Sequence, residues 1–132
     1  MRPGFRGAAR YGDVERLRAL LETDSDVNAR DRYHQTGLML AAQGGHAEVV
    51  RLLIERGADL NVAAKFSLTA LMLAVIGGHT DAVRLLVAAG ADLTFRGSGA
   101  PGFFNKTALG LALARDDAGD MVTILRGAGA PE

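Results

Sequence analysis

The segment of this chain that most resembles a chemical motif is glycine-rich and runs from 97 to 102, Gly97-Ser98-Gly99-Ala100-Pro101-Gly102. Its G-x-G-x-x-G spacing is typical of dinucleotide-binding loops, where a strand precedes the glycines and a helix directs its N–H groups at the pyrophosphate. Here Pro101 stands within the motif, and Phe103 and Phe104 follow its last glycine before the next helix start, at Thr107. We interpret the segment as a loop and expect no cofactor.

Two histidines, His46 and His79, could suggest a metal site, but they are 33 residues apart. Zinc sites need three or four ligands, and two of them are often histidines close together on one helix. The chain has no cysteine, which excludes disulfides and thiolate ligands. We therefore expect both histidines to bond to nearby backbone, and we expect no metal.

Other candidates for catalysis have simpler explanations. Asp116 and Asp117 are adjacent carboxylates between two expected helices, where a solvated loop is the simpler interpretation than a general acid and base. No Ser or Thr stands in a nucleophile elbow. Asn105-Lys106-Thr107 is a glycosylation sequon, which acts only in a secreted eukaryotic protein. The sequence predicts a protein that is not an enzyme.

Both histidines belong to a block of sequence that recurs every 33 residues. Residues 36–61 and 69–94 agree at 16 of 26 positions, whereas unrelated sequences of ordinary composition agree at roughly two. A degraded copy lies upstream, at 8–28, and another copy lies downstream of the glycine-rich loop. We expect a single domain, 1–132, with units at approximately 1–30, 31–63, 64–96 and 102–132 and an inserted loop at 96–102.

Each unit predicts two short helices. Thr36 can accept hydrogen bonds from the free N–H groups of a helix start, and the glycines at 44 and 45 can end that helix. A second apolar run follows, with apolar neighbours three and four residues apart. Because helices this short do not persist alone in water, each must stack on its neighbours. The expected ranges are 37–44, 47–55, 70–76 and 80–88, with a last helix at 121–126.

Charge and hydropathy disfavour some partners. Lys plus Arg and Asp plus Glu number 15 each, so long-range attraction to nucleic acid or an anionic membrane is missing. No apolar stretch reaches the roughly 18 residues that span a membrane, and no apolar signal-peptide core follows the charged N-terminus. We expect a cytoplasmic protein that binds neither nucleic acid nor membrane. Arginines on the first unit, at positions 2, 6, 16 and 18, are expected to face water on a terminal cap.

The unit resembles the ankyrin repeat, whose 33-residue period carries a T-P-L-H-x-A core. The resemblance rests on T-x-L-x-L-A at three sites, G-H at two and G-A-D-L at two, and it covers nearly the whole chain. It implies an all-α solenoid of stacked helix-turn-helix units with β-turn fingers. It also implies that the finger tips and first helices form a concave surface that binds another protein.

The chain departs from the family pattern at three positions of the unit. The proline and the histidine of the core are replaced, which removes a preorganised helix start and a hydrogen bond between units. Stability below that of a consensus array is expected. The finger-turn glycine is also missing, and His34, Ser67 and Asn105 stand in its place. Asn28 and Asn61 match asparagines that can be hydroxylated in animal ankyrin repeats, although bridging the turn is the simpler role.

The expected binding face lies on the fingers, just before each capping threonine. Tyr33, Phe66 and Phe104 occupy one repeat position and are expected to form an aromatic row, with Phe103 beside it. Aromatic and arginine side chains carry much of the energy at protein interfaces. The other candidates are Arg32, Gln35, Lys65, Leu68 and Lys106 on the fingers and Arg10, Tyr11, Gln43, Ile76 and Arg115 on the first helices.

Such a surface would suit an apolar segment with acidic flanks on a partner protein. Three alternatives stay open. The rings could pack on one another, or Phe103 and Phe104 could pin the inserted loop. The chain could also form a homodimer through the same aromatic row or through the last unit.

Overall fold

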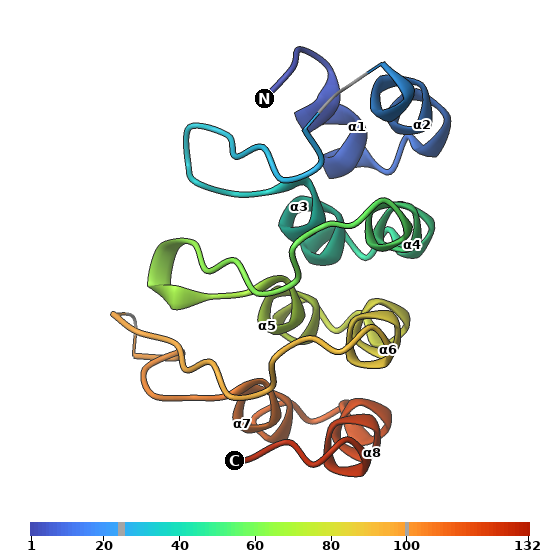
Figure 1. Ribbon diagram of the computed structural model, residues 1–132. Helices are drawn as coiled ribbons and strands as arrows, with labels where there is room; N and C mark the ends of the chain where they lie inside the picture. Colours follow the sequence, from blue (N-terminus) through green and yellow to red (C-terminus); the bar gives the residue numbers. More distant parts are fainter. Residues whose placement is uncertain (24–25, 100) are drawn as a thin grey trace.

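The computed structural model describes residues 1–23, 26–99 and 101–132, and within these ranges its eight α-helices stand in two parallel columns (Figure 1). One column holds the first helix of each pair, α1 (Phe5–Tyr11), α3 (Gly37–Gly44), α5 (Ala70–Ile76) and α7 (Ala108–Leu113). The other holds the second helices, α2 (Val14–Glu22), α4 (Ala47–Glu55), α6 (Thr80–Ala88) and α8 (Gly119–Gly127). The all-α prediction is confirmed, as are the four helix ranges between 37 and 88. The last helix is longer than predicted.

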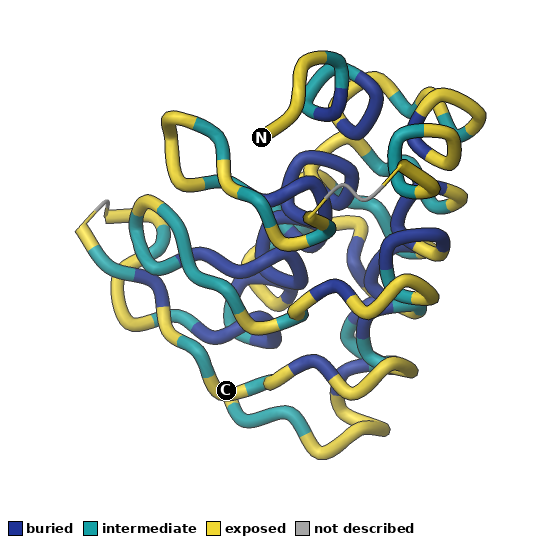
Figure 2. Tube along the Cα trace, turned by 45° about the horizontal axis from the view of Figure 1, so that its top comes forward, coloured by how far each residue is buried: buried dark blue, intermediate teal, exposed yellow. Residues whose placement is uncertain are grey.

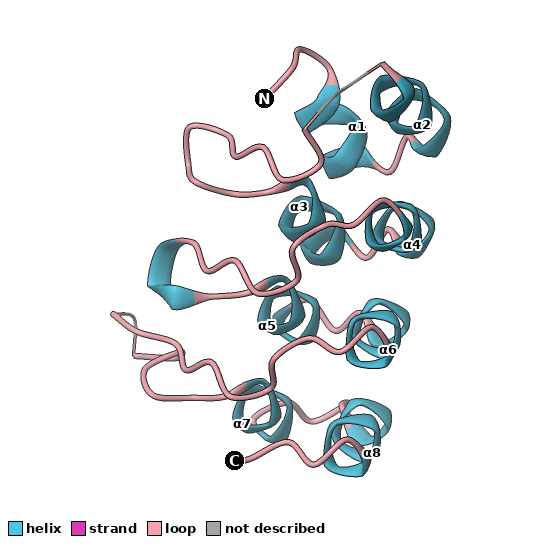
Figure 3. Ribbon diagram, in the orientation of Figure 1, coloured by secondary structure: helices cyan, strands magenta, loops and turns pink. Residues whose placement is uncertain are grey.

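Loops that project from the first-helix column join one pair to the next (Figure 3). We call them the first finger (30–36), the second finger (63–68) and the third finger (96–106). The second finger contains a short 3-10 turn, η1 (Lys65–Ser67). No helix in the described ranges is long and apolar enough to cross a membrane.

Threonine caps fix where the first helices begin. The side-chain oxygens of Thr36, Thr69 and Thr107 accept hydrogen bonds from the backbone N–H three residues on, at 3.3, 3.3 and 3.1 Å. All three threonines are buried. Since each oxygen satisfies an N–H that has no partner within its helix, the cap makes burial of the helix start possible.

The apolar core is a seam that runs along the stack (Figure 2). Leu38, Leu71 and Leu109 repeat one position of the first helices and are at most 2% exposed. Fully burying a leucine side chain stabilises a fold by about 1.5–3 kcal/mol. Because neighbouring pairs supply the burial, each pair depends on the next.

Hydrogen bonds between pairs set the spacing of the stack. His46 Nε2 donates to the carbonyl oxygen of Arg10 (2.8 Å), and His79 Nε2 donates to that of Gln43 (3.0 Å). Both histidines thus bond to backbone, as predicted. On the loops beyond the second helices, the side-chain oxygens of Asn28 and Asn61 accept from the N–H of a residue in the next unit, at 2.7 and 2.8 Å. Bridging is therefore the structural role of these asparagines.

At the last junction an arginine replaces the histidine. Arg115 donates to the carbonyl oxygen of Ile76 at 2.7 Å, and its guanidinium pairs with Asp117 at 3.1 Å. The prediction that Arg115 lies on a first helix is wrong, because α7 ends at Leu113. Its long side chain reaches back across the loop, so this residue links two pairs.

Candidate functional site

The fingers turn through residues with positive φ. His34 has φ 65°, Ser67 57° and Asn105 59°, so these residues adopt the conformation of the glycine they replace. Phe66 also has φ 62°, which was not predicted. A bulky side chain in this region costs about 1–2 kcal/mol relative to extended or helical backbone.

A groove of about 710 Å³ lies between the first and second fingers and the helices α3 and α5. We call it the apolar groove. Eight predicted site residues line it together with three that were not predicted. The predicted ones are Tyr33, Gln35, Gln43, Lys65, Phe66, Leu68, Ile76 and Phe103, and the others are His34, Ala64 and Leu73.

The aromatic residues of the groove differ from the expected row. The rings of Phe66 and Phe103 pack against each other, with centroids 5.8 Å apart and planes at 49°. Phe104 is 66% exposed and lies outside the groove. The ring-on-ring alternative therefore holds for one pair, yet both rings remain partly exposed and line the groove.

The glycine-rich insertion explains why Phe103 takes this place. Ser98 donates its backbone N–H to the carbonyl oxygen of Phe66 at 2.8 Å, and the hydroxyls of Ser67 and Ser98 lie 3.0 Å apart. Within the third finger, Gly97 accepts from the N–H of Asn105 at 2.9 Å. The described part of the insertion thus holds the second finger in place through these hydrogen bonds. Ala100 lies outside the described residues.

The floor of the groove is buried. Leu68 is 6% exposed and Leu73 is 8% exposed, and both belong to the main apolar cluster. Leu68, which was expected on the binding face of the second finger, is therefore largely buried. Leu68 is buried beside the buried cap Thr69, and it lines the groove.

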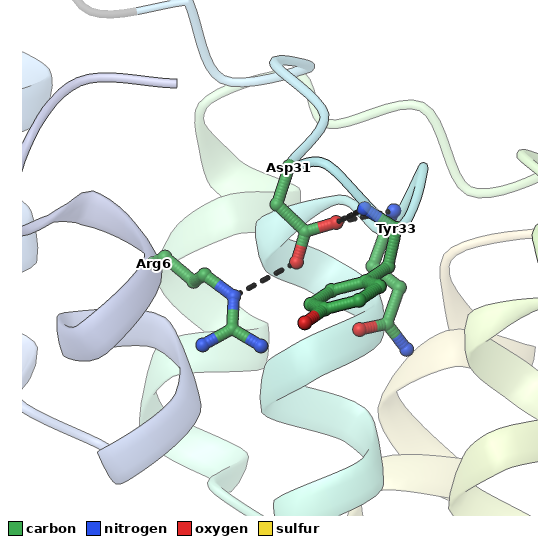
Figure 4. Close-up of polar contacts among 4 residues, drawn as sticks. Arg6, Asp31 and Tyr33 are labelled. Atoms are coloured by element: carbon green, nitrogen blue, oxygen red, sulfur yellow. Dashed lines mark hydrogen bonds and ion pairs between the residues drawn. The ribbon is translucent and has the colours of Figure 1, made fainter.

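An ion pair holds the first finger against α1 (Figure 4). Asp31 Oδ1 accepts from the backbone N–H groups of Tyr33 and Gln35 at 2.8 and 3.0 Å, and its Oδ2 accepts from Arg6 Nε at 2.9 Å. The Asp31 side chain is only 4% exposed. Arg6 was predicted to face outward, but it faces the next finger instead.

The Asp31 carboxylate should make the stability of the fold depend on pH in the acidic range. Burial raises the pKa of Asp31, but the hydrogen bonds from Arg6, Gln35 and Tyr33 together lower it by more than burial raises it. The pKa of Asp31 therefore lies below the ordinary 3.8. A folded pKa below the unfolded one gives stability that is complete above about pH 4 and is lost as the pH falls through the folded value. Asp31→Asn should reduce the free energy of unfolding by about 1 kcal/mol at neutral pH, because the side chain that binds Arg6 loses its negative charge.

Urea unfolding from pH 2.5 to pH 7 would measure this effect. Below about pH 4 the difference between the Asp31→Asn variant and wild type should shrink. Asp116→Asn is the matched control, since Asp116 is exposed. A constant difference across the whole pH range would refute the role of the Asp31 charge.

A second hollow, of about 590 Å³, adjoins the apolar groove on the α1 side. It shares Tyr33, Gln35 and Gln43 with the groove, and Arg6 and Arg10 lie among its other lining residues. We call it the basic hollow. Tyr11, also predicted for the inner wall, lines it as well and is 75% exposed.

The remaining candidates lie outside both hollows. Arg32 is exposed, with its guanidinium 5.1 Å from the centroid of the Tyr33 ring. Lys106 is half-buried, and its carbonyl oxygen accepts from the N–H of Gly97. Asp117 is exposed, and the hydrogen bond from Arg115 lowers its pKa. Within the described ranges, no three His, Asp or Glu side chains are placed to hold a metal ion.

Stacked helix pairs, capping threonines and bonds between pairs define the class of protein: a helical repeat solenoid. The family model for ankyrin repeats (3 copies) matches residues 5–97, well over half of the chain. The chain belongs to the ankyrin repeat family. Repeats of this family generally mediate protein–protein interactions and are generally not enzymes. A search of curated proteins finds no match to the chain.

The pair α7–α8 lies beyond the matched residues, but it continues the stack. Helix α7 packs on α5, and α8 packs on α6. The boundaries of the four units within one domain stay a prediction.

Proposed function

We propose that the chain binds a partner protein whose apolar side chain enters the apolar groove. The observation that carries this proposal is the set of partly exposed rings, Tyr33, Phe66 and Phe103, around a floor of buried leucines. Aromatic rings in a concave site provide large contact area with few rotatable bonds. The occupant is an apolar segment with acidic flanks, because no described residue that lines the groove is acidic and Lys65 is among the lining residues.

The backbone of Phe66 supports the same proposal. A bulky residue with positive φ is strained, and such strain persists only where surrounding contacts hold it. Here Ser98 binds the Phe66 carbonyl, and the Phe103 ring packs on the Phe66 ring. A ring held in place before binding loses little entropy when the partner docks, so preorganisation favours affinity.

Two adjacent phenylalanines offer a matched test of the groove. Phe103→Ala removes a lining ring and should weaken partner binding about tenfold, since truncating a central interface ring typically costs more than 1 kcal/mol. Phe104→Ala removes an exposed ring outside the groove and should change affinity less than about twofold. Equal effects of the two changes would show that the groove is not the binding site.

The partner for this titration must first be found. Proteins retained from source-cell lysate by wild type, but not by the Tyr33→Ala, Phe103→Ala double variant, would be identified by mass spectrometry. Each candidate would then be purified and titrated by calorimetry against the wild type and both single variants. The proposal requires one purified candidate that binds directly with the expected order of affinities.

A second copy of the chain is the competing occupant. Mass measured by light scattering across a dilution series separates the two cases. A monomer at micromolar concentration would remove the homodimer, whereas a dimer abolished by Phe103→Ala would assign the groove to self-association.

A further inference from the structure

Acidic residues are absent from the first-helix column, although the chain as a whole is neutral. Helices α1, α3, α5 and α7 contain no Asp or Glu. Each second helix contains at least one, the set being Glu15, Glu22, Glu48, Glu55, Asp81 and Asp120. On the three fingers the sole acidic residue is Asp31, and Arg6 neutralises it. The acidic residues of the helices therefore all lie in the second-helix column, whereas basic residues occur in both columns.

Several basic side chains near the groove form no ion pair among the described residues, so their positive charge can attract a ligand. Within the described part of the chain, Arg10, Arg32 and Lys65 have no acidic partner. No described residue that lines the apolar groove or the basic hollow is acidic. Screening in physiological salt confines such a field to about 8 Å, so these groups select a charge that comes close.

The basic hollow presents several hydrogen-bond donors to a ligand. Arg10 and Arg6 line it together with Gln35, Gln43 and Leu40. Arg6 binds Asp31 through Nε alone, and its two terminal nitrogens point away from that carboxylate (Figure 4). A guanidinium offers several N–H groups in a planar fork, which matches the two oxygens of a carboxylate.

We infer that the basic hollow is a subsite for an Asp or Glu side chain of the partner, on the α1 side of the apolar anchor. This inference rests on the proposed function of the apolar groove. The groove spans α3 and α5, and the hollow spans α1 and α3. Neighbouring packed helices lie about 8–10 Å apart, and an extended chain advances about 3.3 Å per residue. In an extended segment, the acid thus lies about three residues from the anchor.

A phage-displayed library of random linear dodecapeptides tests this subsite without a known partner. These peptides have no free C-terminus, so enrichment of an acid reports a side chain. Wild type should enrich an apolar residue and an Asp or Glu at a fixed spacing. Arg10→Glu should keep the apolar residue and lose the acid. Arg51→Glu is the matched control, because Arg51 is exposed on α4 and carries the same change of charge on the other column.

One enriched peptide, synthesised with its acid and with the corresponding amide, gives the affinity. On wild type the amide peptide should bind about tenfold more weakly, since a charge-assisted hydrogen bond is lost. On Arg10→Gln, which avoids adding a negative charge, the two peptides should differ by less than about twofold. Circular dichroism would verify that each variant remains helical.

The possible outcomes separate the two proposals. If the enriched peptides depend on Phe103 but share no acidic residue, the subsite is refuted and the groove proposal stands. The same holds if the peptides selected on Arg10→Glu keep the acidic residue. Enrichment that Phe103→Ala does not reduce refutes both. An acid retained by Arg51→Glu and lost by Arg10→Glu supports the subsite.

Discussion

Leu71→Ala is expected to reduce the free energy of unfolding by about 3 kcal/mol. Leu71 is 1% exposed in α5, a helix that packs on α3, α6 and α7. Removing buried methyl groups costs their transfer free energy plus the energy of the cavity, and the cavity cost is largest where neighbours cannot relax. Helices on three sides keep α5 from moving into the space. Urea unfolding monitored by far-UV circular dichroism would give the change directly.

Leu113→Ala is the matched control for this change. Leu113 also lies on a first helix, α7, but is 41% exposed. Its replacement should cost less than about 1 kcal/mol, as surface substitutions usually do. If both variants lost the same stability, burial in the central pairs would not be the source of the effect. Since domains of this size are stable by about 5–15 kcal/mol, the Leu71 loss is a large fraction of the total.

Gly45→Ala is expected to reduce the free energy of unfolding by about 2 kcal/mol. Gly45 ends α3 with φ 73°, where a Cβ costs about 1 kcal/mol. A Cβ at Gly45 would also overlap the ring of His79. That ring cannot move away without breaking its hydrogen bond to Gln43, which adds roughly 1 kcal/mol. Thermal and urea unfolding would both detect the change.

Gly57→Ala separates the backbone strain from the clash. Gly57 has φ 83°, but a Cβ there would meet no atom within 4 Å. It should therefore cost only the backbone part, about 1 kcal/mol. Equal costs at both positions would mean that the junction through His79 contributes nothing. A larger cost at Gly45 would show that the bonds between pairs stabilise the stack that carries the fingers.

These junctions matter for binding because the apolar groove spans two pairs. Tyr33 belongs to the finger before α3, whereas Phe66 belongs to the finger before α5. The relative position of the two rings depends on how α3 and α5 stack. The bond from His79 to Gln43 connects these same two pairs. We therefore expect junction variants to weaken partner binding even where the helices persist.

Much of the helical framework could be predicted because its signals are local and recur. Thr36 and Thr69 cap helices in the same way, and glycines end them at matching positions. A helix of this length needs only a start, a stop and an apolar face, all readable within about ten residues. Because the same start and stop residues recur in the next unit, the two units support each other's helix boundaries. The four helix ranges between 37 and 88 were therefore predicted correctly.

Other features depended on contacts between distant residues. Arg6 and Asp31 are 25 residues apart. The Asx-type spacing of Asp31 before Tyr33 and Gln35 is a local signal, but nothing near Arg6 indicates its partner. Arg115 matched no histidine of the repeat, so its role at the junction was missed. Sequence periodicity also placed Phe104, and not Phe103, in the aromatic row.

By itself the sequence determined the repeat unit, its capped helices and the family, because periodicity and capping act over short stretches of chain. Only the tertiary structure decided which side chains share a groove. The path of the insertion turns Phe103 toward Phe66, and the stacking of α1 beside α3 brings Arg10 close to the same site. Such neighbours are set by the distance and angle between packed helices, which no local pattern encodes.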